Sequence, residues 1–558
     1  MTLVSKPVLR DAGDTSVSTF SWDTAYVASF PVVNAAIMAQ NSFPATFNYT
    51  DATGITISGN WQSWQLCVGG SGQNVQMECI VQSGTATGDN QTGDLTGTSL
   101  IIQIGLQQIG ATTPLNDPTA KSGTGTSQAL VVNTKAVGEE PAVAIINSTY
   151  PNGLSQLLQD LLDDVFKDYF NANIGNFSHV FAVMNVNEVA DQEGFQWIKP
   201  NEFSYAVAAP EGQPIEQCAF GLLAMVGTNT IGPDQQYAVD TKALMNLPSG
   251  ANSAFVISQN MVAKNLLMNG AISIIQGSSA SDFGLSADGL SVTNVNPVTW
   301  GNFQTDNGVI SPTIAVNNFV LRADDTYIYL EITNAQYETS PGVTVHMNMT
   351  QKFSYSAVQG PTGNYYFIPD TTGFGSPQIS ANVSLSEGLQ ITNIITGAVA
   401  AVAGLLLIGS GIAGAVASAA EVTVDAAANV GDIAIEAEAI EEAAEANPVE
   451  AAAENEQGAE DADAGAAQPG NPAQVQNSGL FTSTQFRLAT GLIGAAAGAT
   501  AGGIQCAKAI VSMDYDNIPA FNSFATNCVG ASLWPNTQGY TLKSASFMDS
   551  LVLGIALA

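Results

Sequence analysis

The side chains best suited to chemistry are few in this sequence, and their spacing matches no common catalytic or metal-binding motif. The chain contains two histidines, His179 and His346, among 558 residues. No HExxH pair of a zinc protease helix is present, and the five cysteines form no CxxC pair (Cys67, Cys79, Cys218, Cys506 and Cys528). GxSxG, P-loop and dinucleotide-binding motifs are also absent. The sequence therefore predicts a protein that is not an enzyme and that has no metal site and no cofactor.

The local context of the remaining candidates favours structural roles. His346 lies on the polar face of a strand-like run, and His179 lies in an apolar one. Cys67 and Cys79 fall in predicted strands, where a free cysteine behaves as a small hydrophobic residue. The run Gly69-Gly70-Ser71-Gly72 lacks the lysine and the following helix of a phosphate-binding loop, so it predicts a hairpin turn. Carboxylates are numerous and no pair stands out, which leaves a glycosidase-like pair as an open alternative.

Length and charge limit the classes of partner. A chain of 558 residues exceeds one typical core, which favours two domains with insertions. It carries 13 basic and 48 acidic residues, for a net charge of −35. Nucleic acid requires lysine and arginine at its phosphates, and an anionic membrane would repel such a chain. Any contact with lipid must therefore be mainly apolar, or must use a local site that the overall charge hides.

The cysteines and the first residues of the sequence bear on its compartment. An odd and sparse set of cysteines indicates reduced thiols in a bacterial-type cytosol. The opening residues lack the apolar run of a signal peptide. We expect a protein that is cytoplasmic as synthesised, and any release would need a dedicated exporter or lysis.

Most of the sequence from residue 21 to about residue 380 predicts strands. In the run 343–350, Val343, Val345, Met347 and Met349 alternate with polar residues and share one face. The runs 318–322 and 326–332 are separated by a short Ala-Asp-Asp turn, which predicts a hairpin.

Three helices are expected among these strands. The first spans about residues 23–40 and is kinked or delimited by Pro31. The second follows a potential cap at Asn152 and is strongly amphipathic through Tyr169. The third begins after Ser258. Helices that alternate with blocks of antiparallel strands predict an α+β fold.

The helix-and-strand pattern occurs about twice, which predicts two related modules. A change of composition near residue 389 then marks an insert, and strand-like sequence returns near the end of the chain. The predicted divisions are an N-terminal tail (1–19), a first module (20–200), a second module (201–388), the insert (389–515) and C-terminal strands (516–558).

The insert contains two uncharged stretches, 394–420 and 488–507, joined by an acidic tract that we expect to be a flexible linker over 421–478. Both stretches are rich in small residues, and the candidate membrane or hairpin residues are Gly404, Leu406, Gly494, Gly498 and Gly502. One interpretation is a helical hairpin that inserts into membranes; the other is a tight hairpin docked on the protein body. The acidic tract predicts a solvated spacer, with divalent cation binding as the alternative.

A series of short motifs carries a family resemblance through its order along the chain. The motifs are Phe20-Ser21-Trp22-Asp23-Thr24-Ala25-Tyr26, the run 59–66 with its glycine turn 69–72, the runs 178–182, 197–200 and 254–258, and Leu542-Lys543-Ser544-Ala545-Ser546-Phe547. Together they resemble the TULIP (tubular lipid-binding) proteins of clostridial neurotoxin clusters, the OrfX group and its relatives. The insert departs from this pattern.

The resemblance implies elongated modules in which long helices are wrapped by highly twisted antiparallel sheets around an apolar groove for acyl chains. Helix residues that could line such a groove are Leu157, Leu161, Val165, Val262 and Leu266. The alternative is that these residues fill an ordinary core, and sequence alone does not separate the two.

Three hypotheses for function follow. The first is a lipid-binding accessory component of a bacterial toxin or secreted complex. The second is a membrane-inserting or pore-forming component that uses the hairpin 390–513. The third is a scaffold subunit that binds proteins rather than lipid.

Overall fold

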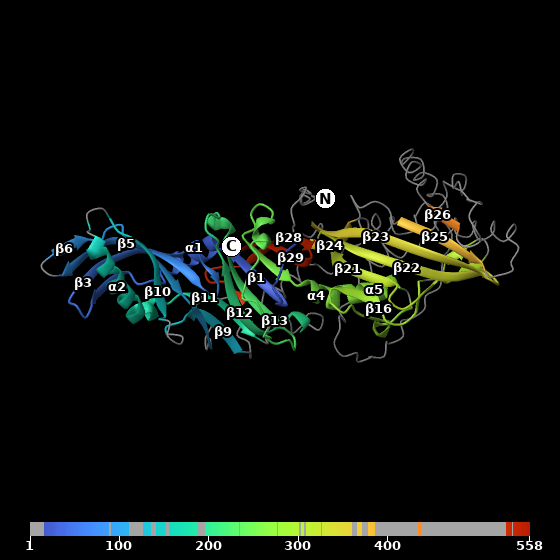
Figure 1. Cartoon of the computed structure of the whole chain (residues 1–558), viewed down its shortest axis with the longest axis horizontal. Coiled ribbons are helices and arrows are strands. Elements are labelled where there is room, and N and C mark those ends of the chain that lie inside the picture. The colour runs from blue at the N-terminus through green and yellow to red at the C-terminus, as the bar shows by residue number, and fades with distance from the viewer. Residues whose placement is uncertain are drawn as a thin grey trace, which may run out of the picture. The chain divides into compact units, whose positions relative to one another are not determined.

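The computed structural model describes residues 16–88, 91–110, 126–135, 141–151, 154, 156–186, 196–233, 235–275, 277–300, 303–305, 308–324, 326–359, 365–370, 378–385, 433–436, 532–537 and 539–557 (Figure 1). Contacts between Cα atoms divide the chain into two compact units. The first comprises Met1–Val262, Ser356–Phe367 and Ala520–Ala558, and the second comprises Ala263–Tyr355 and Ile368–Pro519.

The first unit is built around a seven-stranded antiparallel sheet in the order β28-β29-β14-β1-β13-β12-β4. Strand β1 pairs with β13 on one side and with β14 on the other. The predicted module boundary between residues 200 and 201 falls inside this sheet. The strands are β1 (Thr24–Ser29), β4 (Ser71–Gly72), β12 (Pro200–Ala208), β13 (Ala219–Val226), β14 (Ser253–Ile257), β28 (Tyr540–Met548) and β29 (Ser550–Leu557).

In the middle of this sheet β1 is covered on both faces, and all six of its residues are buried. Ala25 and Val27 point into a cluster on one face, with Trp22, Leu223, Val256 and Val552. On the other face Tyr26 packs edge-on against Phe255 and Trp534, with ring centroids 5.7 and 5.4 Å apart. Because β1 carries apolar side chains on both sides, residues 25–28 show no alternation of apolar and polar types, and its polar residues Thr24 and Ser29 lie at its two ends.

A six-stranded antiparallel sheet forms another part of the first unit, in the order β10-β7-β5-β3-β2 with β6 paired to β5. Helix α2 (Gln156–Asn173) packs against β10 and β2. The strands are β2 (Thr46–Thr50), β3 (Thr56–Leu66), β5 (Val75–Gly88), β6 (Gln91–Asp94), β7 (Ser99–Ile104) and β10 (Val143–Thr149).

A four-stranded sheet, β27-β11-β9-β8, covers part of the central sheet. Phe181 of β11 stacks on Phe220 of β13, with ring centroids 5.5 Å apart. The strands are β8 (Leu106–Gly110), β9 (Thr126–Val132), β11 (Val180–Val186) and β27 (Ser532–Leu533).

Most of a ten-stranded sheet belongs to the second unit, with β15-β16-β21-β22-β23-β25-β26 as its main path. The predicted alternation is confirmed, since Val343, Val345, Met347 and Met349 are all buried. The predicted hairpin is also confirmed, as β21 pairs with β22. The strands are β15 (Phe283–Leu285), β16 (Ser291–Asn294), β17 (Val298–Thr299), β20 (Thr313–Ile314), β21 (Phe319–Asp324), β22 (Tyr327–Ser340), β23 (Val343–Gln359), β24 (Tyr365–Asp370), β25 (Gln378–Leu385) and β26 (Ile433–Glu436), with β18 (Phe303–Thr305) and β19 (Gly308–Ile310) as a separate pair.

The helix predicted over residues 23–40 is wrong in its first part. Residues Thr24–Ser29 form β1, and helix α1 spans only Phe30–Gln40, with Ser29 extended as its cap. A proline near the first turn is well placed to begin a helix, because its missing N–H has no helical partner there. Residues 25–28 of the strand before it are all apolar, and such a run does not distinguish strand from helix.

The other helical predictions hold in position. Helix α2 matches the second, and the third corresponds to α4 (Gln259–Val262), the π-helix η4 (Ala263–Leu267) and α5 (Met268–Ile274) in succession. The remaining helical segments are α3 (Lys242–Met245), η1 (Ile174–Asn176), η2 (Gln196–Ile198), η3 (Ile215–Gln217) and η5 (Ala280–Asp282).

The described chain is therefore α+β with antiparallel strands dominant and few helices, of which α2 with 18 residues is the longest. Within it, no helix is both long enough and apolar enough to cross a bilayer. The predicted hairpin stretches 394–420 and 488–507 lie outside the described residues.

One short strand lies within the predicted flexible linker 421–478. Ile433–Glu436 form strand β26, which pairs with β25 so that Ile435 lies opposite Ala381 and Ile433 opposite Val383. The sequence Ile-Ala-Ile-Glu places both isoleucines on one side of a strand, a short pattern that the acidic composition around it obscures.

Removal of the contact between Phe181 and Phe220 should greatly lower the free energy of unfolding. Phe220→Ala deletes a fully buried ring and should lower the free energy of unfolding of the first unit by about 3–5 kcal/mol. Tryptophan fluorescence during urea titration reports mainly this unit, since five of the six tryptophans lie in it and only Trp300 lies in the second unit. The control Ile109→Ala, at a 44% exposed side chain, should leave the midpoint nearly unchanged. Equal shifts for the two variants would contradict this account of the core.

Candidate functional site

The five helix residues predicted to line a lipid groove lie in different surroundings. On α2, Val165 is buried, whereas Leu157 is 71% exposed and Leu161 is 40% exposed. Val262 of α4 and Leu266 of η4 are both buried. The predicted apolar stripe is therefore covered along only part of α2.

The covered part of α2 is held by aromatic packing. Its buried residues are Leu162, Val165, Phe166, Tyr169 and Phe170. Trp61 of β3 lies between them, 5.7 Å from the Phe170 ring and with its Nε1 donating to Tyr169 Oη at 3.3 Å. Val262 and Leu266 belong to segments that pack elsewhere, α4 on β29 and η4 on β16 and β21. None of the five predicted residues lines the pocket described next.

The first unit contains a pocket of about 550 Å³ beside α1. Its wall combines α1 and the residue before it, Glu216 of η3, the stretch 244–252 from the end of α3 to β14, the turn 535–537 and Leu557 at the end of β29. The lining residues are Ser29, Pro31, Val32, Ala35, Ala36, Glu216, Leu244, Leu247, Ala251, Asn252, Pro535, Asn536, Thr537 and Leu557. Most of these side chains are apolar, and the volume lies within the range of small-molecule sites.

Local structure explains why this pocket stays open. Helix α1 presents Ala35 and Ala36 to it, and alanine side chains leave space that larger ones would fill. On the opposite wall Asn252 fixes the end of β29: its Nδ2 donates to Leu557 O at 3.2 Å and its Oδ1 accepts from Leu557 N at 2.8 Å. The wall is thus held by a paired hydrogen bond rather than by a side chain that enters the space.

Polar groups are sparse in the pocket. Glu216 is the one ionisable side chain among the residues that line it, and it is exposed. Both the Nδ2 and the Oδ1 atom of Asn252 are hydrogen-bonded to Leu557. The amide therefore holds the chain in place more than it recognises a ligand. The lining suits the burial of an apolar group.

The cysteines near this region are poorly suited to nucleophilic chemistry. Burial raises the pKa of Cys67 to about 12, and the nearby Glu78 and Cys218 add to that rise. Burial likewise raises the pKa of Cys79 and of Cys218 above the usual thiol value. Because the thiolate is the reactive form, these side chains act as apolar filling at neutral pH.

Both histidines are tied into the fold. His179 directly precedes β11 and is fully buried; its Nδ1 is hydrogen-bonded to Ser42 Oγ at 3.0 Å, and its Nε2 has no partner among the described residues. Burial lowers the pKa of His179 to about 3. His346 is half-buried on β23, with its nitrogens 2.7 Å from Asn334 Oδ1 and from Ser384 Oγ.

The run Gly69–Gly72 forms a turn, as predicted. Gly69 and Gly72 have φ angles of +108° and +58°, which glycine adopts without strain. Ala209 N donates to Gly70 O at 3.0 Å, so the turn is joined to β12 through backbone atoms rather than open to a phosphate. In the described part of the chain, no three His, Cys, Asp or Glu side chains are grouped to hold a metal ion.

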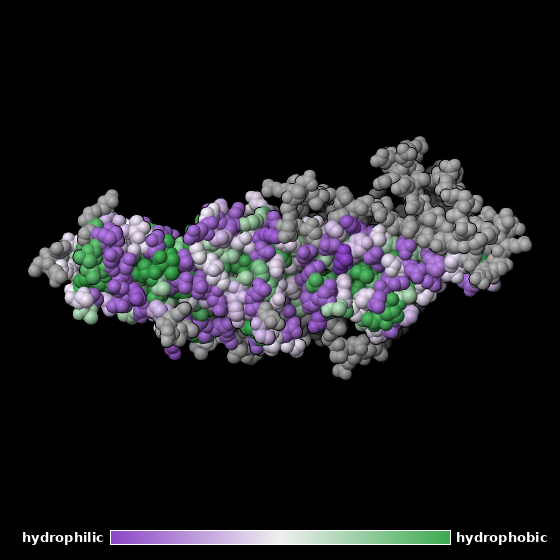
Figure 2. Space-filling model, in the orientation of Figure 1, coloured by the Kyte–Doolittle hydropathy of each residue, from purple (hydrophilic) through white to green (hydrophobic). Residues whose placement is uncertain are grey.

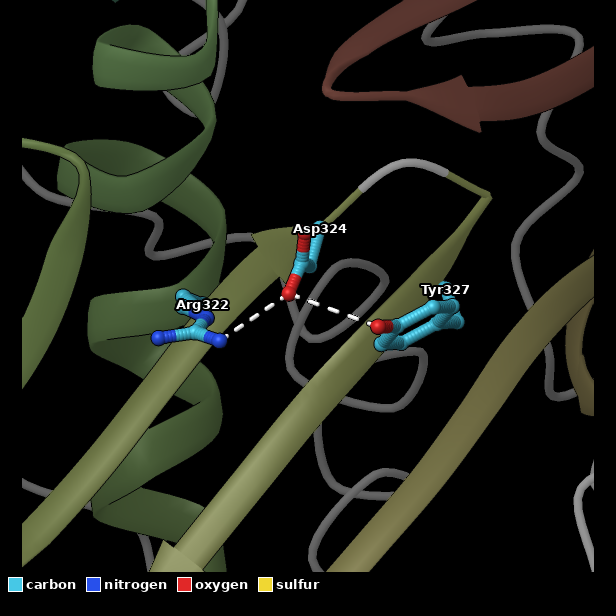
Figure 3. Close-up of polar contacts among 3 residues, drawn as sticks. All are labelled: Arg322, Asp324 and Tyr327. Atoms are coloured by element: carbon cyan, nitrogen blue, oxygen red, sulfur yellow. Dashed lines mark hydrogen bonds and ion pairs between the residues drawn. The ribbon is translucent and has the colours of Figure 1, made fainter. Parts of the chain in front are cut away.

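Two of the few cations lie on the solvent face of the second unit's sheet. Arg322 pairs with Asp324 at 3.0 Å, and the Tyr327 hydroxyl donates to the same carboxylate at 3.4 Å (Figure 3). Arg322 also lies over the Tyr329 ring, and Lys352 lies over the Tyr327 ring, at 4.9 and 4.4 Å from the centroids. Such exposed pairs usually stabilise a sheet by less than about 1 kcal/mol.

Sequence reasoning missed the pocket because its lining comes from five separated parts of the chain. No motif or spacing links Ala35 to Leu247 or Leu557, and only the folded sheet brings them together. The predicted hairpin residues Gly404, Leu406, Gly494, Gly498 and Gly502 lie outside the described residues.

The buried His179 predicts a specific acid sensitivity. Its folded pKa of about 3 lies below the unfolded value of 6.5, so its contribution is complete above pH 6.5 and is lost as pH falls toward 3. The loss approaches about 1.4 kcal/mol per pH unit in that window. Lowering the pH from 7 to 5 should therefore decrease the unfolding free energy of the wild type, measured with urea. In His179→Gln that decrease should be smaller by about 2 kcal/mol. His346→Gln is the matched control, and equal pH dependence in all three proteins would refute this assignment.

Comparison with known proteins places the chain in a family. The family model described as "OrfX-like: Protein OrfX2/OrfX3/P47" matches residues 19–498. Protein OrfX3 of Paraclostridium bifermentans is 28% identical over 278 residues, which cover 46% of this chain and 54% of that protein. Protein OrfX3 of Clostridium botulinum (strain Kyoto / Type A2) is 26% identical over 272 residues, or 45% and 54% of the two chains. The chain thus spans about half the length of these relatives.

Among solved structures, P47 from Clostridium botulinum A2 is similar with a TM-score of 0.48 and 18% identity, over 70% of this chain and 86% of P47. The family match covers most of the present sequence and agrees with the resemblance seen in its motifs. The chain belongs to the OrfX-like family, the OrfX group of clostridial neurotoxin clusters.

Proposed function

We propose that this protein is a lipid-binding accessory component of a toxin-associated complex, and that it holds an acyl-chain lipid in the pocket beside α1 without catalysing a reaction. The observation that carries the proposal is the pocket of about 550 Å³ with its mainly apolar lining. A TULIP-type fold for the modules is part of the same proposal.

Burial of methylene groups would supply the affinity. Each methylene removed from water contributes about 0.8 kcal/mol, so a chain segment of a few carbons is enough for measurable binding. Val32, Leu244 and Leu247 provide apolar surface, while the small Ala35 and Ala36 leave room for the ligand.

The charges of the site bear on the class of lipid. Glu216 lines the pocket, and the chain as a whole carries a net charge of −35. A carboxylate beside the ligand disfavours an anionic headgroup and tolerates a neutral or zwitterionic one. We therefore expect phosphatidylcholine or phosphatidylethanolamine types to be preferred over phosphatidylserine or phosphatidylglycerol.

The first test is mass spectrometry of an organic extract of the purified, detergent-free protein. The proposal predicts a lipid at about one molecule per chain in the wild type. Ala35→Trp places a large side chain in the pocket from an exposed position of α1 and should reduce the bound lipid several-fold, because it occupies the same space.

The matched control is Ala39→Trp, one turn further along the same helix at an exposed position that does not line the pocket. Both variants carry the same small loss of helix propensity. The control should retain lipid at the wild-type level. The proposal is refuted if the wild-type extract contains no lipid, or if Ala35→Trp and the wild type contain equal amounts.

A further inference from the structure

The first half of α2 leaves apolar residues uncovered. Leu157 is 71% exposed and Leu161 is 40% exposed, although each lies on an amphipathic helix packed against a sheet. Leu154 and Leu158 are partly covered, because they lie over Gly93 of β6; a Cβ at that glycine would come within 2.8 Å of Leu154 Cδ2. In Figure 2 hydrophobic residues gather near α2 on the visible face, between hydrophilic ones.

The exposed leucines continue into a row of carboxylates on the same face. Leu157, Leu161, Asp164 and Asp168 are spaced at i, i+4, i+7 and i+11, which aligns them along one side of an α-helix. All four are exposed. We call these four residues the α2 face.

The two aspartates have no role in holding α2 in place. Asp163, by contrast, accepts a hydrogen bond from the Tyr150 hydroxyl at 2.7 Å. Within the described residues neither Asp164 nor Asp168 forms an ion pair or a side-chain hydrogen bond. Neither aspartate lies in the first turn of α2, where a carboxylate would favour the helix dipole. Helix stability therefore does not explain their position.

The charge of the α2 face selects among occupants. A second copy of this face offers no cation: parallel docking would oppose the aspartates to like charges, and antiparallel docking would set them against the leucines. An anionic membrane would repel the aspartates. A partner with lysine or arginine would pair with the free carboxylates while its apolar side chains covered the leucines. Such a partner would contact both the leucines and the aspartates of the α2 face.

We propose that the α2 face binds a protein segment that presents two apolar anchors followed by basic residues, in helical spacing. This surface is separate from the lipid pocket and does not depend on its occupancy.

The test uses defined peptides and the full-length protein. Two fluorescein-labelled, alanine-based helical peptides of roughly 20 residues carry leucines at i and i+4 and lysines at i+7 and i+11, in one direction and in reverse, to match parallel and antiparallel docking. Fluorescence anisotropy at low salt should show saturable binding of at least one of them. Peptides with glutamate in place of lysine should not bind.

Variants locate the binding. Leu157→Ser with Leu161→Ser should weaken binding by at least about tenfold, because both apolar contacts are lost. Asp164→Asn with Asp168→Asn should weaken it about as much and reduce its dependence on salt. All four positions are exposed, so circular dichroism should show unchanged folding.

Matched controls exclude a general effect of polarity or charge. Ile109→Ser with Val316→Ser makes the same apolar-to-polar change at exposed side chains elsewhere, and Glu211→Gln with Glu338→Gln removes the same number of exposed charges. Both should bind the lysine peptide as the wild type does. The proposal is overturned by absence of peptide binding, by equal binding of the glutamate peptide, or by unchanged binding of the leucine variant. Binding of phosphatidylcholine vesicles that the leucine variant alone loses would also overturn it, in favour of a membrane contact.

Discussion

In the central sheet of the first unit β1 is buried on both faces, and the arrangement of that unit depends on satisfying this constraint. Every residue of β1 is buried, so each face of the strand requires a cover. One cover is the cluster around Trp22 and Leu223, and the other is the small sheet that carries Phe181. The edge of β14 is closed by β29, which comes from the end of the chain. The pocket beside α1 arises where these pieces meet, because α1 begins directly after β1 and β29 ends next to Asn252.

The same constraint explains which parts of the fold the sequence predicts. The run 343–350 has one buried and one half-buried face, so its alternation is visible in the sequence. Helix α2 is predicted for the same reason, since its stripe has the helical period. The residues of β1 carry apolar side chains on both sides and show no periodic pattern. They also directly precede a helix that contains a proline, so the sequence predicts one long helix there. The pocket could not be predicted, because its residues are brought together only by long-range strand pairing.

The chain has few charged residues, and those in the described part make two recurring kinds of contact. Arg322 and Lys352 lie over tyrosine rings on a solvent-facing sheet, and Arg322 shares a carboxylate with a tyrosine hydroxyl. The carboxylates of Asp51 and Asp94 accept hydrogen bonds from neighbouring turns, and these bonds lower their pKa values. Asp164 and Asp168 depart from this pattern. Neither forms an ion pair or a side-chain hydrogen bond among the described residues, and both lie on the same side of α2 as the exposed Leu157 and Leu161.

The pocket and the α2 face are joined by a short chain of contacts, and its stiffness determines whether the two sites could influence each other. Asn34 of α1 is buried and holds the end of β3 at both of its amide atoms, with Nδ2 donating to Leu66 O at 3.0 Å and Oδ1 accepting from Leu66 N at 2.7 Å. β3 in turn carries Trp61 and Trp64, on which α2 rests. Coupling between sites requires an element with two arrangements that each ligand prefers differently. A strand fixed by a two-point hydrogen bond and buried indole rings offers one arrangement, since packed interiors resist continuous deformation. Lipid in the pocket and a partner on α2 should therefore bind independently, with additive free energies.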